Sequence, residues 1–135
     1  SLHAGRVTAN WLSAIAELPC QIDYASEYRY KNPHVDKNSL LITISQSGET
    51  ADTLAALRYA NEKDYLSSVT ICNVPTSALA RESDFSLFTN AGPEIGVAST
   101  KAFPTQLAGL LLLTLAFSTR RELNPTLSRR VVHRL

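Results

Sequence analysis

Residues 40–50 read Leu-Leu-Ile-Thr-Ile-Ser-Gln-Ser-Gly-Glu-Thr, an apolar run that changes abruptly into small polar residues. Its first half combines aliphatic and β-branched side chains, which is typical of a buried strand. Residues 49–63 then favour a helix. The stretch therefore predicts a strand, a tight turn and a helix start, the unit from which parallel α/β sheets are built.

The turn of this stretch is rich in groups that donate hydrogen bonds. Ser45, Ser47 and Thr50 supply hydroxyls, Gln46 supplies an amide, and Gly48 lets backbone N–H groups approach a ligand closely. The N-terminus of the following helix would add a partial positive charge at the same place. We therefore expect the turn to bind an anion, and a phosphate ester is the natural ligand.

A second interpretation of the same residues is helix capping, because Ser, Thr and Gly are also preferred at helix N-termini. Against it, three hydroxyls exceed what one cap needs, and ligands of α/β sheets bind where a strand ends. The glycine patterns of P-loops and of dinucleotide-binding loops are missing from the turn. A nucleotide is therefore not indicated.

Length and composition suit one domain with its own core. The chain has 135 residues, 44% of them hydrophobic, and a net charge of +1, which implies neither a nucleic-acid nor a membrane partner. Its longest apolar run, 107–117, is shorter than the ~20 residues of a membrane span and predicts a buried helix. Cys20 and Cys72 lie far apart, so we expect neither a disulfide framework nor a zinc site, and a reducing, cytoplasmic setting. His3, His34 and His133 lack the spacing of metal ligands, so we expect no metal. We also expect no cofactor.

The rest of the chain alternates between helical and strand patterns. We expect helices at 2–18, 26–30, 78–82, from 99 through 117, and from 124 onward, and strands at 20–25, 67–74 and 85–89. This order predicts an α/β fold with a parallel sheet covered by helices on both faces. Because the chain starts with Ser1 and contains no methionine, we also expect it to be part of a longer protein.

Two motifs resemble a known family. Residues 45–53, Ser-Gln-Ser-Gly-Glu-Thr-Ala-Asp-Thr, resemble the phosphosugar loop of SIS (sugar isomerase) domains. Residues 90–103, Asn-Ala-Gly-Pro-Glu-Ile-Gly-Val-Ala-Ser-Thr-Lys-Ala-Phe, are similar to a segment of the isomerising glutamine:fructose-6-phosphate aminotransferases. The resemblance implies a three-layer αβα sandwich, the SIS (flavodoxin-like) fold, lacking here the first strand, which would precede Ser1.

The resemblance also implies a binding site for fructose 6-phosphate or glucosamine 6-phosphate. Its residues lie in loops that follow strands, with contacts to the 6-phosphate from Ser45, Gln46, Ser47 and Thr50, contacts to the sugar from Val97 and Ser99, and a further contact from Ser1. The catalytic groups would lie outside this chain, in a second SIS domain with its C-terminal tail and in a glutaminase domain. By this resemblance the chain alone is inactive.

The implied organisation is an SIS domain at 1–118, followed at 119–135 by the start of a linker helix toward the second SIS domain, in a homodimeric enzyme. For Lys101 we expect an ion pair with Glu94 rather than a substrate contact. Glu49, at a helix N-terminus, is expected to stay an anion and not to act as a base. Two alternatives stay open, a phosphosugar-sensing SIS module of a transcriptional regulator and a related SIS deglycase or isomerase.

Overall fold

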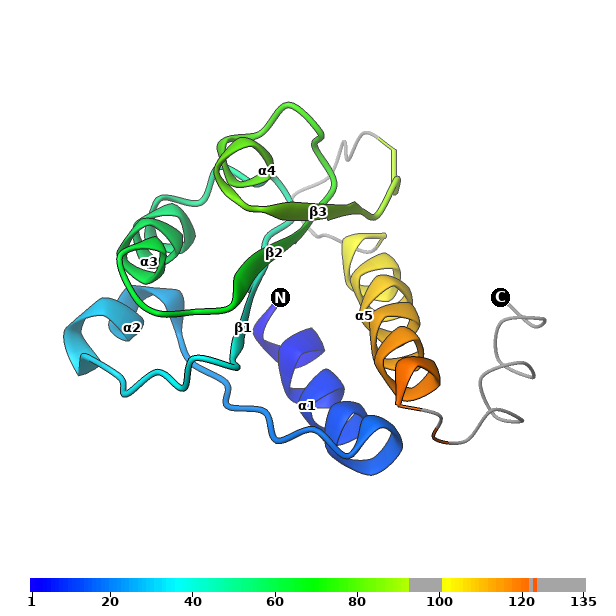
Figure 1. Cartoon of the computed structure of the whole chain (residues 1–135). Helices are drawn as coiled ribbons and strands as arrows, with labels where there is room; N and C mark the ends of the chain where they lie inside the picture. The colour runs from blue at the N-terminus through cyan, green and yellow to red at the C-terminus, as the bar shows by residue number, and fades with distance from the viewer. Residues whose placement is uncertain (93–100, 122, 124–135) are drawn as a thin grey trace.

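The fold is organised by helices and strands that alternate along the chain. In the computed structural model, residues 1–92, 101–121 and 123 are described. Their elements are α1 (Leu2–Ala16), α2 (Ala25–Lys31), β1 (Leu40–Ile44), α3 (Ala51–Asn61), β2 (Ser67–Cys72), α4 (Ala78–Glu82), β3 (Phe85–Phe88) and α5 (Ala102–Arg120) (Figure 1).

The strands form a parallel sheet in the order β1-β2-β3. The register of β1 and β2 runs from Leu40 opposite Ser67 to Ile44 opposite Ile71, and β3 pairs along the other side of β2. Because the strands are parallel, their carboxyl ends meet at one edge of the sheet. The turns that follow β1, β2 and β3 therefore lie at that same edge.

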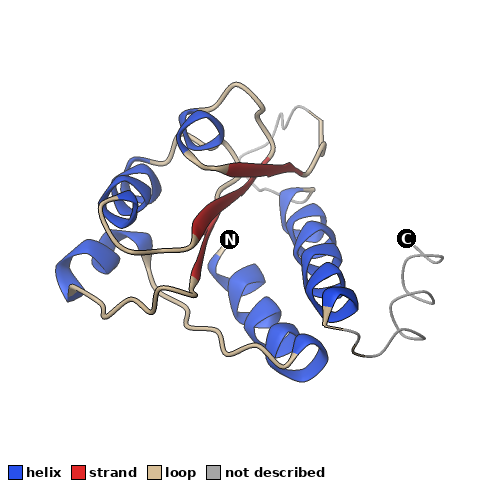
Figure 2. Cartoon of the chain, in the orientation of Figure 1, coloured by secondary structure: helices blue, strands red, loops and turns tan. Residues whose placement is uncertain are grey.

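Helices cover both faces of the sheet. Helices α1 and α5 lie together on one face, and α2 and α3 lie on the other, with α4 beside α3 (Figures 1 and 2). On the first face Ala4, Ile71 and Leu110 form a buried cluster against which Ile42 packs. On the second face Leu41 packs against the cluster around α3, as the alternation of side chains along a strand requires. The predicted three-layer α/β arrangement is confirmed.

The strand predicted at 20–25 is wrong. Residues 20–24 are irregular, and α2 already begins at Ala25. A strand is defined by hydrogen bonds to a neighbour, and the weak alternation of this segment finds no pairing strand among the described residues. Instead Asp23 lies 2.5 Å from the Lys31 ammonium group, so the segment is tied to α2 through side chains.

Helix α5 corresponds to the helix expected from 99 through 117; it ends at Arg120, and the expected start at 99 lies outside the described residues. Its 19 residues have a mean hydropathy of 1.4, so by length and composition alone it could cross a membrane, as many core helices of soluble proteins also could. In this fold it packs against α1 and β2, with Leu110, Thr114 and Leu115 buried. At its end Arg121 donates hydrogen bonds to the carbonyls of Ala16 and Glu17, which ties α5 to the end of α1.

Asp84 joins the start of β3 to the start of β2. Its Oδ2 atom accepts hydrogen bonds from the Ser68 N–H (2.7 Å), the Ser67 hydroxyl (2.9 Å) and the Ser68 hydroxyl (3.0 Å). These bonds hold the pKa of the Asp84 carboxyl below its usual value, and the bond from the Ser68 backbone N–H contributes most. The carboxylate form is therefore the one that stabilises the fold.

A pH-dependent stability follows from that shift. Because the folded-state pKa of Asp84 is depressed, its contribution is present above the pKa of the unfolded chain, about 4, and is lost as the pH falls through the folded value. We expect Asp84→Asn to lower the unfolding temperature by about 3 °C at pH 7 and by progressively less below pH 4. Thermal unfolding of both proteins across this range measures the effect. Asp64→Asn, at an exposed aspartate after α3, is the control. If the difference in unfolding temperature between Asp84→Asn and the unsubstituted protein stayed constant with pH, the Asp84 carboxylate would not be the stabilising group.

Candidate functional site

The polar turn after β1 begins as a continuation of the sheet. The Ser45 N–H donates to the Ile71 carbonyl and the Asn73 N–H donates to the Gln46 carbonyl, both at 3.0 Å. These two bonds extend the pairing of β1 with β2 beyond Ile44. The turn is therefore fixed in place at the carboxyl edge of the sheet, where parallel α/β sheets bind their ligands.

The Ser45 side chain closes the turn from inside. It is 3% exposed, and its hydroxyl oxygen accepts a hydrogen bond from the Gly48 N–H at 3.1 Å. The Thr50 hydroxyl lies 3.0 Å from the same oxygen. Ser45 and Thr50, five positions apart in the sequence, are thus brought together in the turn.

Simple capping of α3 does not account for the hydroxyls. Thr50 occupies the N-cap position of α3, yet its side chain makes no capping bond to the described part of that helix and contacts Ser45 instead. Ser47 accepts a hydrogen bond from the Glu49 N–H at 3.2 Å and is only half-buried. Part of the hydroxyl set therefore shapes the turn, and the O–H groups of Ser47 and Thr50 lie where solvent or a ligand can reach them.

Gly48 is required for conformation and for space. Its φ is +69°, a left-handed conformation, and a Cβ atom built on it would lie 2.1 Å from the Ser77 Oγ and 2.5 Å from the Ser77 Cβ. Ser77 is 1% exposed and precedes α4, and the Gly48 carbonyl accepts the Leu79 N–H at 3.0 Å. The turn is thus packed directly onto the start of α4.

Glu49 acts on a different helix from the one expected. Its Oε1 atom accepts a hydrogen bond of 2.7 Å from the N–H of Ala78, the first residue of α4. The expectation of a structural carboxylate at a helix N-terminus holds, but the helix is α4 and not α3. Together with Gly48 it joins the turn after β1 to the turn after β2.

Ser1 lies at the same end of the sheet as the turn. It precedes α1, and its hydroxyl accepts a hydrogen bond of 3.3 Å from the amide of Gln106, a buried residue of α5. In the first turn of α1, Ala4 packs against Ile71 near the carboxyl end of β2. The other two predicted site residues, Val97 and Ser99, lie outside the described residues, as does Glu94, the expected partner of Lys101.

The sequence analysis missed Asn73, which directly follows β2. Its Oδ1 atom accepts hydrogen bonds from the Ala91 N–H (2.7 Å) and the Thr89 hydroxyl (3.2 Å), and its Nδ2 donates to the Gly92 carbonyl at 3.0 Å. The available signal was its position, a polar residue at the carboxyl end of a strand next to the one that precedes the polar turn. This residue contacts both segments that carried the family resemblance.

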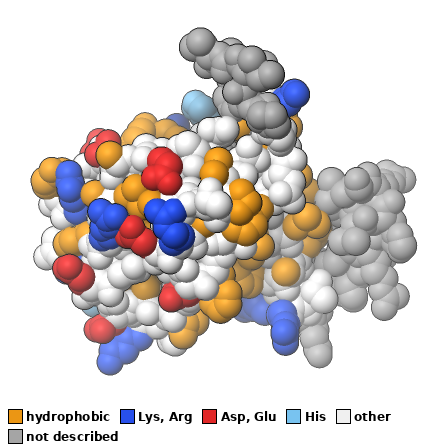
Figure 3. Space-filling model, turned by 90° about the horizontal axis from the view of Figure 1, so that it is seen from above, with side chains coloured by type: hydrophobic (Ala, Val, Ile, Leu, Met, Phe, Trp, Pro, Cys, Tyr) orange, Lys and Arg blue, Asp and Glu red, His pale blue; other side chains and the backbone are white. Residues whose placement is uncertain are grey.

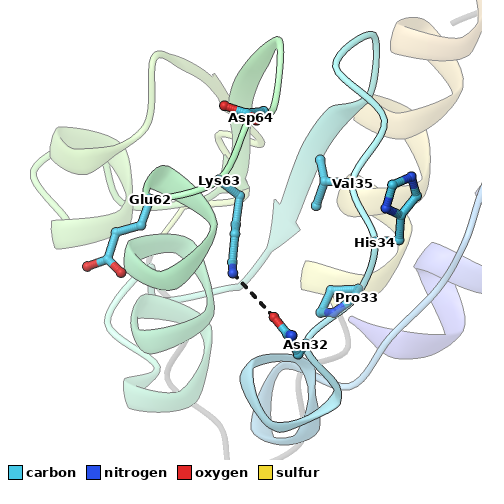
Figure 4. Close-up of a pocket in the computed structure, with 7 residues that line it drawn as sticks. All are labelled: Asn32, Pro33, His34, Val35, Glu62, Lys63 and Asp64. Carbon is cyan, nitrogen blue, oxygen red and sulfur yellow. Dashed lines mark hydrogen bonds between the residues drawn. The ribbon is translucent and has the colours of Figure 1, made fainter.

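Two clefts lie at the opposite, amino-terminal edge of the sheet. One, of about 440 Å³, lies between the loop after α2 and the end of α3, where Lys63 reaches across to Asn32 at 3.3 Å (Figure 4). The other is lined by the end of α3, by the starts of β1 and β2, and by Asp84, which precedes β3. Both lie away from the carboxyl ends of the strands, so we do not assign the phosphate-binding site to either.

On one face of the molecule, side chains of both charge signs are mixed (Figure 3). On the face shown in Figure 3, Lys and Arg side chains alternate with Asp and Glu side chains, in keeping with a net charge of +1. Burial and the 2.6 Å hydrogen bond with Tyr65 raise the pKa of Tyr28. That pair lies between α2 and the end of α3, so its shift reflects packing between helices and not the polar turn.

The fold and the turn together define the class of protein. A model of the SIS domain family matches residues 1–116. The chain belongs to the SIS domain family, and the predicted resemblance is confirmed.

Among proteins of known function, the chain is similar to one kind of enzyme in particular. Over 115 residues the chain is 64% identical to glutamine:fructose-6-phosphate aminotransferase (isomerizing) of Pseudomonas aeruginosa, covering 85% of this chain and 19% of the relative. It is 53% identical to the same enzyme of Escherichia coli K12 over its full length, covering 22% of the relative. The chain therefore spans about a fifth of the length of these curated relatives.

Solved structures agree with this grouping. The C-terminal domain of glucosamine-fructose-6-phosphate aminotransferase from Francisella tularensis superposes with a TM-score of 0.95 at 45% identity, covering 99% of this chain and 38% of that one. Glucosamine-6-phosphate deaminase of Thermotoga maritima, at 22% identity, has a TM-score of 0.76 over 87% of this chain and 37% of its own. This second likeness shows the shared fold alone.

Proposed function

We propose that this chain is a phosphosugar-binding half-site, from the first SIS domain of a glutamine:fructose-6-phosphate aminotransferase. Such an enzyme converts fructose 6-phosphate and glutamine into glucosamine 6-phosphate. The observation that carries the proposal is the turn at 45–50, closed on the buried Ser45 hydroxyl and held at the carboxyl edge of the sheet. The identity of 53–64% to such enzymes supports it.

The turn has the chemistry that a phosphate monoester needs. Helix α3 begins at Ala51, directly after the turn, so the partial positive charge of its N-terminus adds to the side-chain donors. Gln46 and Ser47 would donate from the rim. Ser45 and Thr50 use one hydroxyl hydrogen in the bond between them, so that pair would offer the other to the phosphate while Ser45 keeps the turn in shape. Val97, Ser99 and Ser1 would then contact the sugar.

Binding the 6-phosphate at one end would hold the sugar in a fixed orientation. Moving a proton between adjacent sugar carbons requires a positioned base, and no residue of this chain is proposed for that role. The base and the groups that open the ring would come from a second SIS domain, and ammonia from a glutaminase domain. The parent enzyme is proposed to be a cytoplasmic homodimer that assembles through its SIS domains.

A titration of the 135-residue chain tests the proposal. We expect fructose 6-phosphate and glucosamine 6-phosphate to bind with a Kd of about 1 mM or tighter, because a dianionic phosphate gains several charge-assisted hydrogen bonds. In amide NMR spectra the shifts should be largest at 45–50, with inorganic phosphate affecting the same turn more weakly. A folded chain whose spectrum responds to neither sugar phosphate would refute a half-site that works on its own.

A further inference from the structure

We infer that Asn73 is a positioning residue that holds residues 89–92, the stretch just before the expected sugar contacts, in a fixed orientation relative to the phosphate-binding turn. The inference rests on the proposed function, because it takes the 6-phosphate to bind at 45–50 and the sugar to contact Val97 and Ser99. Asn73 itself need not touch the ligand. Its role follows from two separate sets of hydrogen bonds, one from its backbone and one from its side chain.

The backbone of Asn73 fixes the phosphate-binding turn. Its N–H donates to the Gln46 carbonyl at 3.0 Å, which continues the parallel pairing of β1 and β2 into the turn. This bond is independent of the side chain at position 73. A substitution here therefore leaves the attachment of the 45–50 turn unchanged.

The side chain of Asn73 fixes the other segment. An amide side chain can accept two hydrogen bonds and donate two. Asn73 accepts from the Ala91 N–H and the Thr89 hydroxyl and donates to the Gly92 carbonyl, so three of these four are used on one short stretch of chain. A hydrophobic side chain could make none of these bonds, and a serine is too short to reach all three groups.

The stretch held in this way does not adopt a default backbone conformation. Asn90 has a φ of +49° and Gly92 a φ of +73°, so left-handed residues flank Ala91 on both sides. A positive φ is uncommon for a residue other than glycine, so the conformation of Asn90 is one that surrounding contacts must favour, whereas Gly92 adopts it freely. Before them, the Thr89 N–H donates to the Cys72 carbonyl and continues the pairing of β2 with β3. The conformation of residues 89–92 is therefore set largely by the Asn73 amide.

One substitution should therefore change the affinities for two ligands by different amounts. Asn73→Ala should leave the turn at 45–50 in place but release residues 89–92, so the sugar contacts weaken while the phosphate contacts remain. We expect the affinity for fructose 6-phosphate to fall about tenfold, the equivalent of one or two hydrogen bonds. The affinity for inorganic phosphate, which reports the turn alone, should change less than about twofold.

The experiment uses the full-length natural chain that carries these residues, with the two dissociation constants measured by calorimetry or competition. Asn61→Ala is the matched control: its amide also donates to a backbone carbonyl, that of Glu82 at 3.3 Å, but at the opposite edge of the sheet. Both affinities of that variant should equal those of the unsubstituted protein. Thr89→Val, which removes only the bond from the Thr89 hydroxyl, should weaken fructose 6-phosphate binding about threefold and spare inorganic phosphate.

Each outcome of these measurements supports or overturns the positioning role of Asn73. Equal weakening of both ligands by Asn73→Ala, or no weakening of either, would overturn the positioning role while leaving the proposed function intact. Failure of the unsubstituted protein to bind fructose 6-phosphate would overturn the proposed function and the inference with it. Where Asn73→Ala does not fold, Thr89→Val decides alone, because a variant with unchanged affinity for the sugar phosphate would contradict the role of the amide.

Discussion

Replacing Gly48 by alanine should destabilise the chain by about 3 kcal/mol and abolish measurable phosphosugar binding. A left-handed backbone costs an alanine about 1 kcal/mol. The new Cβ would overlap the Ser77 side chain, 2.1 Å from its Oγ, and overpacking of this kind typically costs about 1–3 kcal/mol more. Ser77 cannot move aside easily because it is buried and caps α4 through the Ala80 N–H. Urea unfolding measures the stability, and a fructose 6-phosphate titration measures the binding.

Gly92→Ala is the matched control for this substitution. Gly92 has a φ of +73°, but a Cβ built there meets no heavy atom of the described residues within 4 Å. It should therefore cost only the conformational part, about 1 kcal/mol. A double variant, Gly48→Ala with Ser77→Gly, should recover part of the loss by removing the overlapping atoms. Equal costs for the two glycines would show that contact with Ser77 is not the cause.

The sequence predicted what is decided locally. The run at 40–50 gave the right strand, turn and helix because side-chain pattern, turn chemistry and helix start all lie within a few residues of one another. Ser45 and Thr50 were expected in the same turn, five positions apart, and the structure adds the contact between their hydroxyls. The three-layer arrangement also followed, because alternating helices and apolar strands have few other ways to bury their apolar faces.

What the sequence did not predict depends on contacts between distant segments. The bond from the Ala78 N–H to Glu49 joins residues 29 positions apart, and the bond from the Ala91 N–H to Asn73 joins residues 18 apart. No local pattern marks the bond of Glu49 to α4, and the only signal for Asn73 was its position at the carboxyl end of a strand. The strand expected at 20–25 failed for the same reason, because pairing depends on a neighbour and not on the segment alone. At the carboxyl edge of the sheet, local chemistry supplies the donors and long-range contacts orient them.

Ser45→Ala should lower both stability and phosphosugar affinity strongly, because the buried Ser45 oxygen is hydrogen-bonded to two groups of the turn. Its removal leaves the buried Gly48 N–H without the acceptor now at 3.1 Å and the Thr50 hydroxyl without its contact at 3.0 Å. Leaving a buried donor unsatisfied costs about 1–3 kcal/mol, so we expect a loss of about 2 kcal/mol in the free energy of unfolding. We expect fructose 6-phosphate to bind about 100-fold more weakly, because the turn also loses the shape that aims its other donors.

Ser47→Ala is the matched control, because it removes a hydroxyl of the turn without removing the one that holds the turn in shape. Ser47 accepts the N–H of Glu49, an exposed residue, so water can replace its hydroxyl and the stability should fall by less than about 0.5 kcal/mol. Its effect on binding should be a single lost contact, about tenfold. Urea unfolding and the same titration compare the two variants directly. If Ser45→Ala were as mild as Ser47→Ala in both measurements, the buried hydroxyl would not be what organises the turn.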